Sequence, residues 1–188
     1  MAKQEKSKGQ LSLVQEQEIS NLLLSYAKAL TILNDYDNQK LKDVPGQKSE
    51  LILDYQACQK VILQIKKELG AKNEAGDLFG VEREEGFLAI VNNLYQTFDQ
   101  QELYPTIEDK ASHLLYLIIK DHPFSDGNKR IAAFFFVYFL DRSDYLYCQS
   151  GERRIDNNTL IALVLLIAES RPKEKIVFIK IIKNLLVD

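Results

Sequence analysis

Apolar residues recur at helical spacing along most of the chain, and this pattern favours a mainly α fold. A first amphipathic stretch covers 12–34, a second covers about 49–69 and stops at Gly70, and a third runs from about 84 to 100. Each stretch collects its apolar side chains on one side, as expected of a helix packed against a core. The broad apolar face of the first stretch consists of Leu13, Ile19, Leu22, Leu23, Tyr26, Leu30 and Leu33.

Two helices predicted in the second half are apolar on nearly every side. The first opens at Pro105-Thr106, where Thr106 and Asp109 have the spacing of a capping box, and it continues to about residue 120. The second covers about 127–141. A helix that is apolar all round is usually buried, so these two helices are predicted to form the centre of the fold.

The last third of the chain reads as an irregular segment followed by two helices. Residues 143–155 show no regular pattern. Asp156 can cap a helix over 158–169, and Pro172 suits the first turn of a final helix that ends at about residue 187.

Polar interruptions divide the chain into three parts. Residues 1–10 lack the apolar stretch of a signal peptide and are expected to be flexible. Residues 11–70 are expected to form an N-terminal helical extension, and 71–188 to form the main domain. The chain could also be one domain of a longer polypeptide.

Composition narrows the classes of function. A net charge of −3 and a pI of about 5.5 leave no basic surface for nucleic acid. Leu160–Ile167 is too short to span a bilayer, so no membrane association is expected and a cytoplasmic location is favoured. Two His residues and the widely spaced Cys58 and Cys148 disfavour a zinc site.

The chemically richest segment is Asp-His-Pro-Phe-Ser-Asp-Gly-Asn-Lys-Arg, residues 121–130, between the two predicted buried helices. His122 can act as a general base, Asp126 can ligate Mg²⁺, and Gly127 lets a phosphate approach the backbone. A helix N-terminus attracts phosphate, so the segment predicts a site for a nucleoside triphosphate and its metal. The remaining hydrogen-bond donors are Asn128, Lys129 and Arg130.

Each of these residues also has a simpler explanation when taken singly. His122 can cap the carbonyl groups at a helix C-terminus, and Asp126 can be an N-cap. Lys129 and Arg130 can be solvated surface residues, and Phe124 a core anchor. Their coincidence within one short segment favours the functional interpretation.

The segment resembles the signature of the Fic/Doc (Fido) family, His-x-Phe-x-[Asp/Glu]-Gly-Asn-[Gly/Lys]-Arg, and matches every defined position. The resemblance covers about residues 75–185. It implies a Fido-type helical bundle with a short β-hairpin flap before the signature loop, so the Fido domain would occupy 71–188. Fic proteins usually transfer AMP from ATP to a Ser, Thr or Tyr hydroxyl of a target protein. Doc-type members instead transfer the terminal phosphoryl group.

The resemblance also implies a role for each signature residue. His122 would deprotonate the target hydroxyl, and Asp126 would hold Mg²⁺. ATP would be the co-substrate, with its phosphates bound by the backbone at Gly127 and neutralised by Arg130. The nucleotide-binding set is therefore Gly127, Asn128, Lys129 and Arg130.

Members of the family hold their target by strand-like pairing with a flap ahead of the signature. The loop over residues 71–86 is the matching region, with a short hairpin expected around Leu78–Val81. A plain interhelical loop is the alternative. The residues expected at the docking edge are Leu78, Phe79, Gly80 and Val81.

Two departures from the signature bear on the reaction. Lys129 and Ala133 stand where AMP-transferring members typically have Gly and a second Arg, so phosphoryl transfer is slightly favoured. Gly127 favours AMP transfer instead, because Doc has a bulkier residue at this position.

The nearest match to the family's inhibitory helix, Ser12–Gln17, fails at its last position, and Ser12 is more simply an N-cap. An antitoxin-like partner could inhibit the protein instead.

Two functions of other classes stay open. The chain could be a non-catalytic module that binds a nucleotide or a partner, although the intact His122 speaks against this. It could also be a structural or interaction domain, such as a toxin-like C-terminal part of a longer protein.

Overall fold

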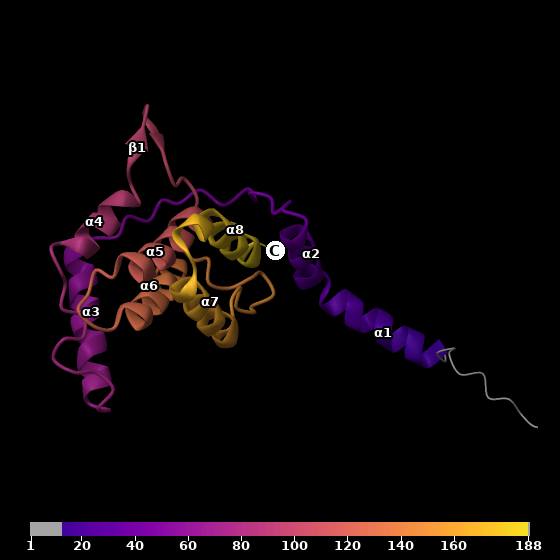
Figure 1. Ribbon diagram of the computed structural model, residues 1–188, viewed down its shortest axis with the longest axis horizontal. Coiled ribbons are helices and arrows are strands. Elements are labelled where there is room, and N and C mark those ends of the chain that lie inside the picture. The colour runs from indigo at the N-terminus through magenta and orange to yellow at the C-terminus, as the bar shows by residue number, and fades with distance from the viewer. Residues whose placement is uncertain (1–12, 188) are drawn as a thin grey trace, which may run out of the picture. The chain divides into compact units, whose positions relative to one another are not determined.

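The computed structural model describes residues 13–187, and the chain divides into two compact units at the Lys42–Asp43 bond (Figure 1). The sequence places the start of the main domain at residue 71, whereas the structure adds the preceding helix and its approach to the second unit. The reason is packing, because Cys58 and Ile62 of that helix are buried in the core of the second unit.

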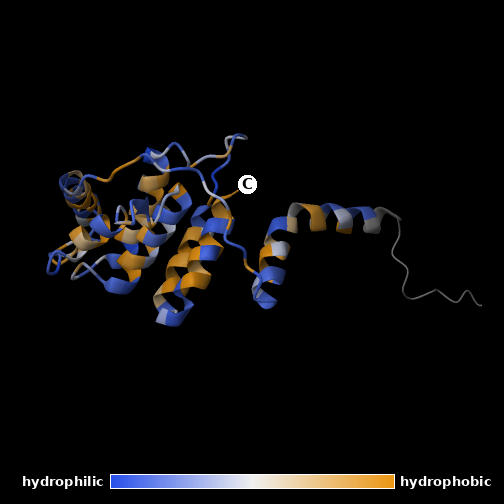
Figure 2. Cartoon of the chain, turned by 90° about the horizontal axis from the view of Figure 1, so that it is seen from above, coloured by the Kyte–Doolittle hydropathy of each residue, from blue (hydrophilic) through white to orange (hydrophobic). Residues whose placement is uncertain are grey.

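The first unit contains two helices, α1 (Leu13–Ser25) and α2 (Ala27–Asp37). The single helix predicted over 12–34 is interrupted at Tyr26, although the Leu30 N–H still donates to the Tyr26 carbonyl at 3.0 Å. No side chain of α2 is buried, and apolar positions alternate with polar ones along both helices (Figure 2). Ser12, at the start of the nearest match to the inhibitory helix and the predicted N-cap, lies outside the described residues.

The second unit is mainly helical, with one small antiparallel sheet. Its elements in chain order are α3 (Tyr55–Gly70), α4 (Gly86–Asn93), β1 (Thr97–Phe98), β2 (Gln101–Glu102), α5 (Ile107–Asp121), α6 (Asn128–Arg142), α7 (Asn157–Glu169), the 3₁₀ helix η1 (Pro172–Glu174) and α8 (Lys175–Leu186).

Helices α3, α5 and α7 begin where the N-cap side chain bonds a free backbone N–H. The Asp54 carboxylate accepts from the Ala57 N–H at 2.7 Å, so α3 starts later than the predicted residue 49. Thr106 accepts from the Asp109 N–H at 3.1 Å and caps α5 as predicted. Asp156 caps α7 in the same way, as its position in the sequence indicates.

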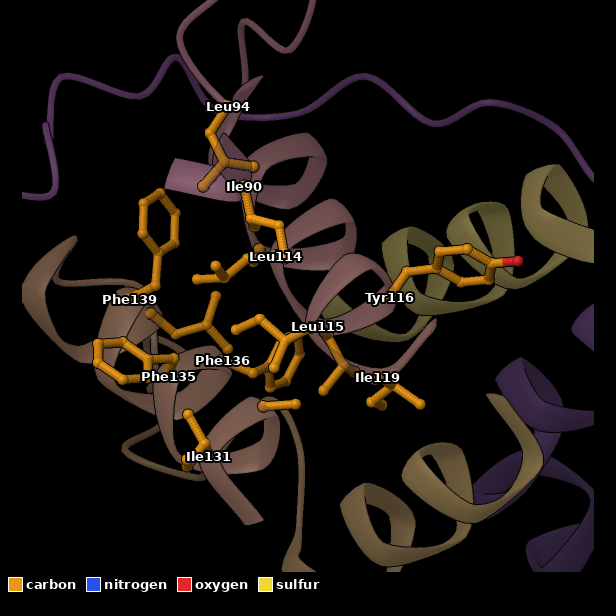
Figure 3. Close-up of a cluster of buried hydrophobic side chains, with 14 of the residues drawn as sticks. Ile90, Leu94, Leu114, Leu115, Tyr116, Ile119, Ile131, Phe135, Phe136 and Phe139 are labelled. Atoms are coloured by element: carbon orange, nitrogen blue, oxygen red, sulfur yellow. The ribbon is translucent and has the colours of Figure 1, made fainter. Parts of the chain in front are cut away.

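The core is built around α5, which packs against α4, α6, α7 and α8. Figure 3 shows apolar side chains of α4, α5 and α6 converging, with Leu114 and Leu115 near Phe136. All three of these side chains are fully buried, as is most of the apolar sequence of α5 and α6. The prediction that these two helices form the buried centre is confirmed. Each fully buried side chain of this size contributes roughly 1.5–3 kcal/mol.

The hairpin of the fold lies at a different place from the one expected. The helix predicted over 84–100 ends at Asn93, and β1 then pairs with β2 in the register Thr97↔Glu102. The two turn residues between the strands, Asp99 and Gln100, both have positive φ, as tight hairpin turns require. The Leu78–Val81 segment forms no hairpin of its own and pairs with the signature loop instead.

Candidate functional site

The signature occupies the turn between α5 and α6. His122 ends α5 in the left-handed conformation, with φ +49°, and Pro123 follows it. Its side chain is exposed, and within the described part of the chain its ring makes no hydrogen bond. The ring therefore does not cap the α5 carbonyls. A solvent-facing imidazole of this kind can take a proton from a bound molecule.

The turn is closed by the side chain of Asn128. Its amide oxygen accepts from the Phe124 N–H at 2.9 Å, and its amide nitrogen donates to the Phe124 carbonyl at 2.8 Å. The Phe124 ring is buried, with its centroid 5.2 Å from that of Phe87. Asn128 thus holds the loop in shape, and Phe124 anchors it to the core.

Gly127 rather than Asp126 is the N-cap of α6, with φ +86° and no side chain to bond the first N–H groups of the helix. Among the described residues, the backbone N–H groups of Asn128 and Lys129 have no acceptor. Unpaired N–H groups and the positive end of the helix dipole make a helix terminus of this kind favourable for binding anions.

The charged residues of the signature are all exposed. Arg130 donates to the Glu74 carbonyl, lies 3.4 Å from the Asp126 carboxylate, and stacks over the Phe79 ring at 4.7 Å. Lys129 points to solvent from the first turn of α6. The guanidinium of Arg130 is therefore held between the signature and the loop that precedes α4.

The donor set for a metal is sparse. Among residues 13–187 no cluster of three or more His, Cys, Asp or Glu side chains is present. The Asp126 side chain is half-exposed beside the α6 N-terminus, so it can supply one oxygen ligand. That fits Mg²⁺, which usually takes one or two carboxylates and completes its coordination with phosphates and water.

Three backbone hydrogen bonds, which we call the ladder, join the flap strand, defined here as Gly80–Arg83, to the signature loop Pro123–Asp126, and they include an isolated antiparallel bridge between Glu82 and Phe124. The Arg83 N–H donates to the Pro123 carbonyl at 2.8 Å, and the Ser125 N–H donates to the Val81 carbonyl at 2.8 Å. The Gly80 N–H donates to the Asp126 carbonyl at 3.1 Å, where Phe79 and Asp126 form an isolated parallel bridge. The segment predicted to act as a flap thus lies directly beside the signature, while its docking role stays a prediction.

The opposite edge of the flap strand is open. Backbone groups alternate sides along a strand, so the N–H and carbonyl of Glu82 point away from the signature loop. Neither has a hydrogen-bond partner among the described residues. Leu78 and Val81 are exposed at the same segment, whereas the expected edge residue Phe79 is buried beneath the loop.

Several contacts that shape the site have no signal in the sequence pattern. The Glu82 carboxylate accepts from the Tyr55 hydroxyl and from the first N–H groups of α4. Burial and this carboxylate raise the pKa of Tyr55 to about 12. The contact of Arg130 with the Glu74 carbonyl also cannot be predicted from the sequence, because every residue has a backbone carbonyl.

Two clefts of the second unit lie away from the signature. One, of about 370 Å³, is lined by residues 48–52, Tyr95, Thr97, Glu102 and Lys110. The other, of about 250 Å³, lies along α8 beside His113. Neither is lined by a residue of the signature loop, so neither cleft is the site of the predicted chemistry.

Residues 53–140 match the model of the Fic/DOC family. These residues belong to the Fic/DOC family. The match begins at the approach to α3, earlier than the residue 75 expected from the signature, and ends within α6. No curated protein and no solved structure matches the chain. Proteins of the Fic/DOC family are generally transferases, although non-catalytic members also occur.

Within residues 13–187, every helix is too short or too polar to cross a bilayer.

Proposed function

We propose that this protein transfers a phosphate-containing group from ATP to a hydroxyl side chain of a target protein. One observation supports it above the others. An exposed imidazole, His122, sits at the end of α5, one rigid turn away from the unpaired N–H groups that begin α6. Such a pair places a general base beside a binding site for phosphate.

Each residue of the turn would have a separate role in the transfer reaction. His122 would take the proton of the target hydroxyl, while the first N–H groups of α6 and Lys129 would bind the phosphates. Asp126 would hold Mg²⁺, which supplies charge neutralisation on the phosphates when it is bound. Arg130 would exchange its bonds to the Glu74 carbonyl and Asp126 for bonds to phosphate oxygens.

Phosphoryl transfer is the version of the reaction that we favour. Lys129 adds a cation and bulk at the first turn of α6, and Ala133 provides no second cation one turn further along. Both features favour a nucleotide bound with its γ-phosphate toward His122. AMP transfer is the alternative, and Gly127 favours it because a glycine leaves more room for the nucleotide at the helix start.

The target would dock on the open edge of the flap strand. The free N–H and carbonyl of Glu82 can pair with the main chain of an extended segment, and the exposed Leu78 and Val81 can contact its side chains. Pairing of this kind selects a backbone conformation and fixes the distance from the target hydroxyl to His122.

Labelled ATP tests the proposal and separates the two reactions. The protein is incubated with Mg²⁺, a cell lysate and ATP labelled at either the α or the γ position, with His122→Asn as the control. Label from the γ position alone supports phosphoryl transfer, and label from the α position supports AMP transfer. If neither label reaches any protein, while ATP still binds, the chain is a non-catalytic binding module.

A further inference from the structure

The carboxylate of Glu82 makes three hydrogen bonds that connect separate parts of the second unit. One oxygen accepts from the Phe87 N–H at 2.8 Å and from the Leu88 N–H at 3.0 Å. The other accepts from the Tyr55 hydroxyl at 2.5 Å. Glu82 itself lies in the flap strand, so its side chain ties that strand to the starts of α4 and α3.

At the start of α4 the Glu82 carboxylate replaces a side-chain N-cap. The N-cap residue, Glu85, is in the left-handed conformation and makes no side-chain bond to the helix. The Glu82 carboxylate bonds the free N–H groups instead, and its negative charge is favourable at the positive end of the helix. This fixes the flap strand at its C-terminal side.

Glu82 is also connected to the signature loop, both by backbone pairing and by packing in the core. Glu82 pairs with Phe124 in the ladder between the flap strand and the signature loop. The ring of Phe124 packs on Phe87, and the ring of Phe87 lies 6.3 Å from that of Tyr55. Phe87 and Tyr55, which bond the Glu82 carboxylate, therefore also belong to the apolar cluster on which Phe124 of the signature loop packs.

We infer that Glu82 is a positioning residue, whose carboxylate sets the place of the flap strand relative to His122. The inference rests on the proposed function, because it concerns the alignment of a docked target with the base. Loss of the carboxylate would loosen the strand against the loop. A displacement of about 1 Å in a reacting pair can lower a rate by about a hundredfold.

Four variants separate positioning from a general loss of stability. Glu82→Ala removes all three hydrogen bonds. Of these three, Tyr55→Phe removes only the bond to α3, together with the bond that the Gln59 amide donates to the same hydroxyl. Glu82→Gln retains an acceptor for the α4 N–H groups and gains a donor toward the Tyr55 oxygen. Glu84→Ala is the matched control, because it removes a neighbouring exposed acid that lies in the same loop.

Hydrogen exchange of the ladder amides is the readout that needs no activity. In Glu82→Ala the amides of Gly80, Arg83 and Ser125 should exchange about tenfold faster than in the unaltered protein. Amides of the buried centre, such as Leu115 in α5, should keep their rates. Glu82→Gln and Glu84→Ala should stay within about threefold of the unaltered protein at every site.

Transfer kinetics give the second readout. Glu82→Ala should lower kcat/KM for the protein target by about tenfold or more, with KM for ATP unchanged, because the phosphate site is on α6. Glu82→Gln should restore most of the loss.

The two proposals fail in different ways. If the unaltered protein transfers no label but the ladder amides respond to Glu82→Ala, the proposed function fails and the structural part of the inference holds. If the amides of Gly80 and Ser125 exchange at the same rate in Glu82→Ala, Glu82 does not hold the strand and the inference is overturned. The inference is also overturned if Glu82→Ala changes only the KM for ATP and leaves the kinetics with the protein target unchanged.

Discussion

The ring of Phe79 fills the space that a Cβ atom on Gly127 would need. A Cβ built on Gly127 would lie 2.4 Å from the nearest ring carbon, and the residue also has φ +86°. Two independent constraints therefore require glycine at the first position of the α6 turn. The flap segment and the signature fit together only because this residue has no side chain.

Gly127→Ala should lower the free energy of unfolding by about 2 kcal/mol or more, since it adds a steric clash to an unfavourable φ. Chemical denaturation followed by circular dichroism measures the change. Gly76→Ala is the matched control, because a Cβ there would meet nothing within 4 Å. Equal stability of the two variants would contradict the packing described for Phe79.

His122→Asn should abolish transfer without changing the melting temperature. The side chain is exposed and unbonded within the described chain, and Asn tolerates the left-handed conformation that this position needs. Loss of a general base lowers a rate by about a hundredfold to ten-thousandfold. A variant that still transfers at the original rate would remove His122 from the mechanism.

The unfolding free energy should fall as the pH is lowered from about 6.5 to 4, because of His113. Burial lowers the pKa of His113 to about 4, with Lys175 and Lys183 acting in the same direction, against the bond to the Asp109 carbonyl. The unfolded chain takes up this proton near pH 6.5 and the folded chain only near 4, so acid in that window favours unfolding. The full loss is about 3 kcal/mol.

The control for this titration is His113→Gln, which keeps an N–H donor for the Asp109 carbonyl but has no group that titrates in the window. The difference in stability between the two proteins, measured from pH 4 to 7, isolates the histidine from the carboxylates. Parallel curves would mean that His113 is protonated as easily in the fold as in the unfolded chain.

Lys183→Met should destabilise the second unit strongly. The ammonium of Lys183 is almost fully buried and lies 2.5 Å from Asp109 and 2.5 Å from Asp43. Removal of one partner from a fully buried ion pair costs about 3–5 kcal/mol; here Asp109 stays largely desolvated but Asp43 is exposed, so the loss should fall toward or below the lower end of that range. Lys173→Met removes the same charge from an exposed position and should change stability by less than about 0.5 kcal/mol.

The sequence predicts best those features that depend on neighbouring residues. The Thr106 and Asp156 caps and the continuous apolar runs of α5 and α6 are local, so the buried centre follows from them. The signature itself is also local, and the family match agrees with it.

The features that sequence reasoning missed depend on contacts between distant segments. The contact of Glu82 with Tyr55 spans 27 positions, and Arg130 finds its carbonyl 56 positions away at Glu74. The sequence predicts the end of a helix where the hairpin Thr97–Glu102 lies, since the two-residue turn of Asp99 and Gln100 has no glycine to mark it.

The ladder between the flap strand and the signature loop has a consequence for selectivity. An extended peptide that adds to the free edge at Glu82 would become the third strand of a small sheet whose middle strand is the flap. Side chains alternate faces along such a strand, and a slip of one residue turns each of them over. Only one position of the peptide could then present its hydroxyl to the imidazole, so the choice of residue would follow from strand register rather than from a side-chain pocket.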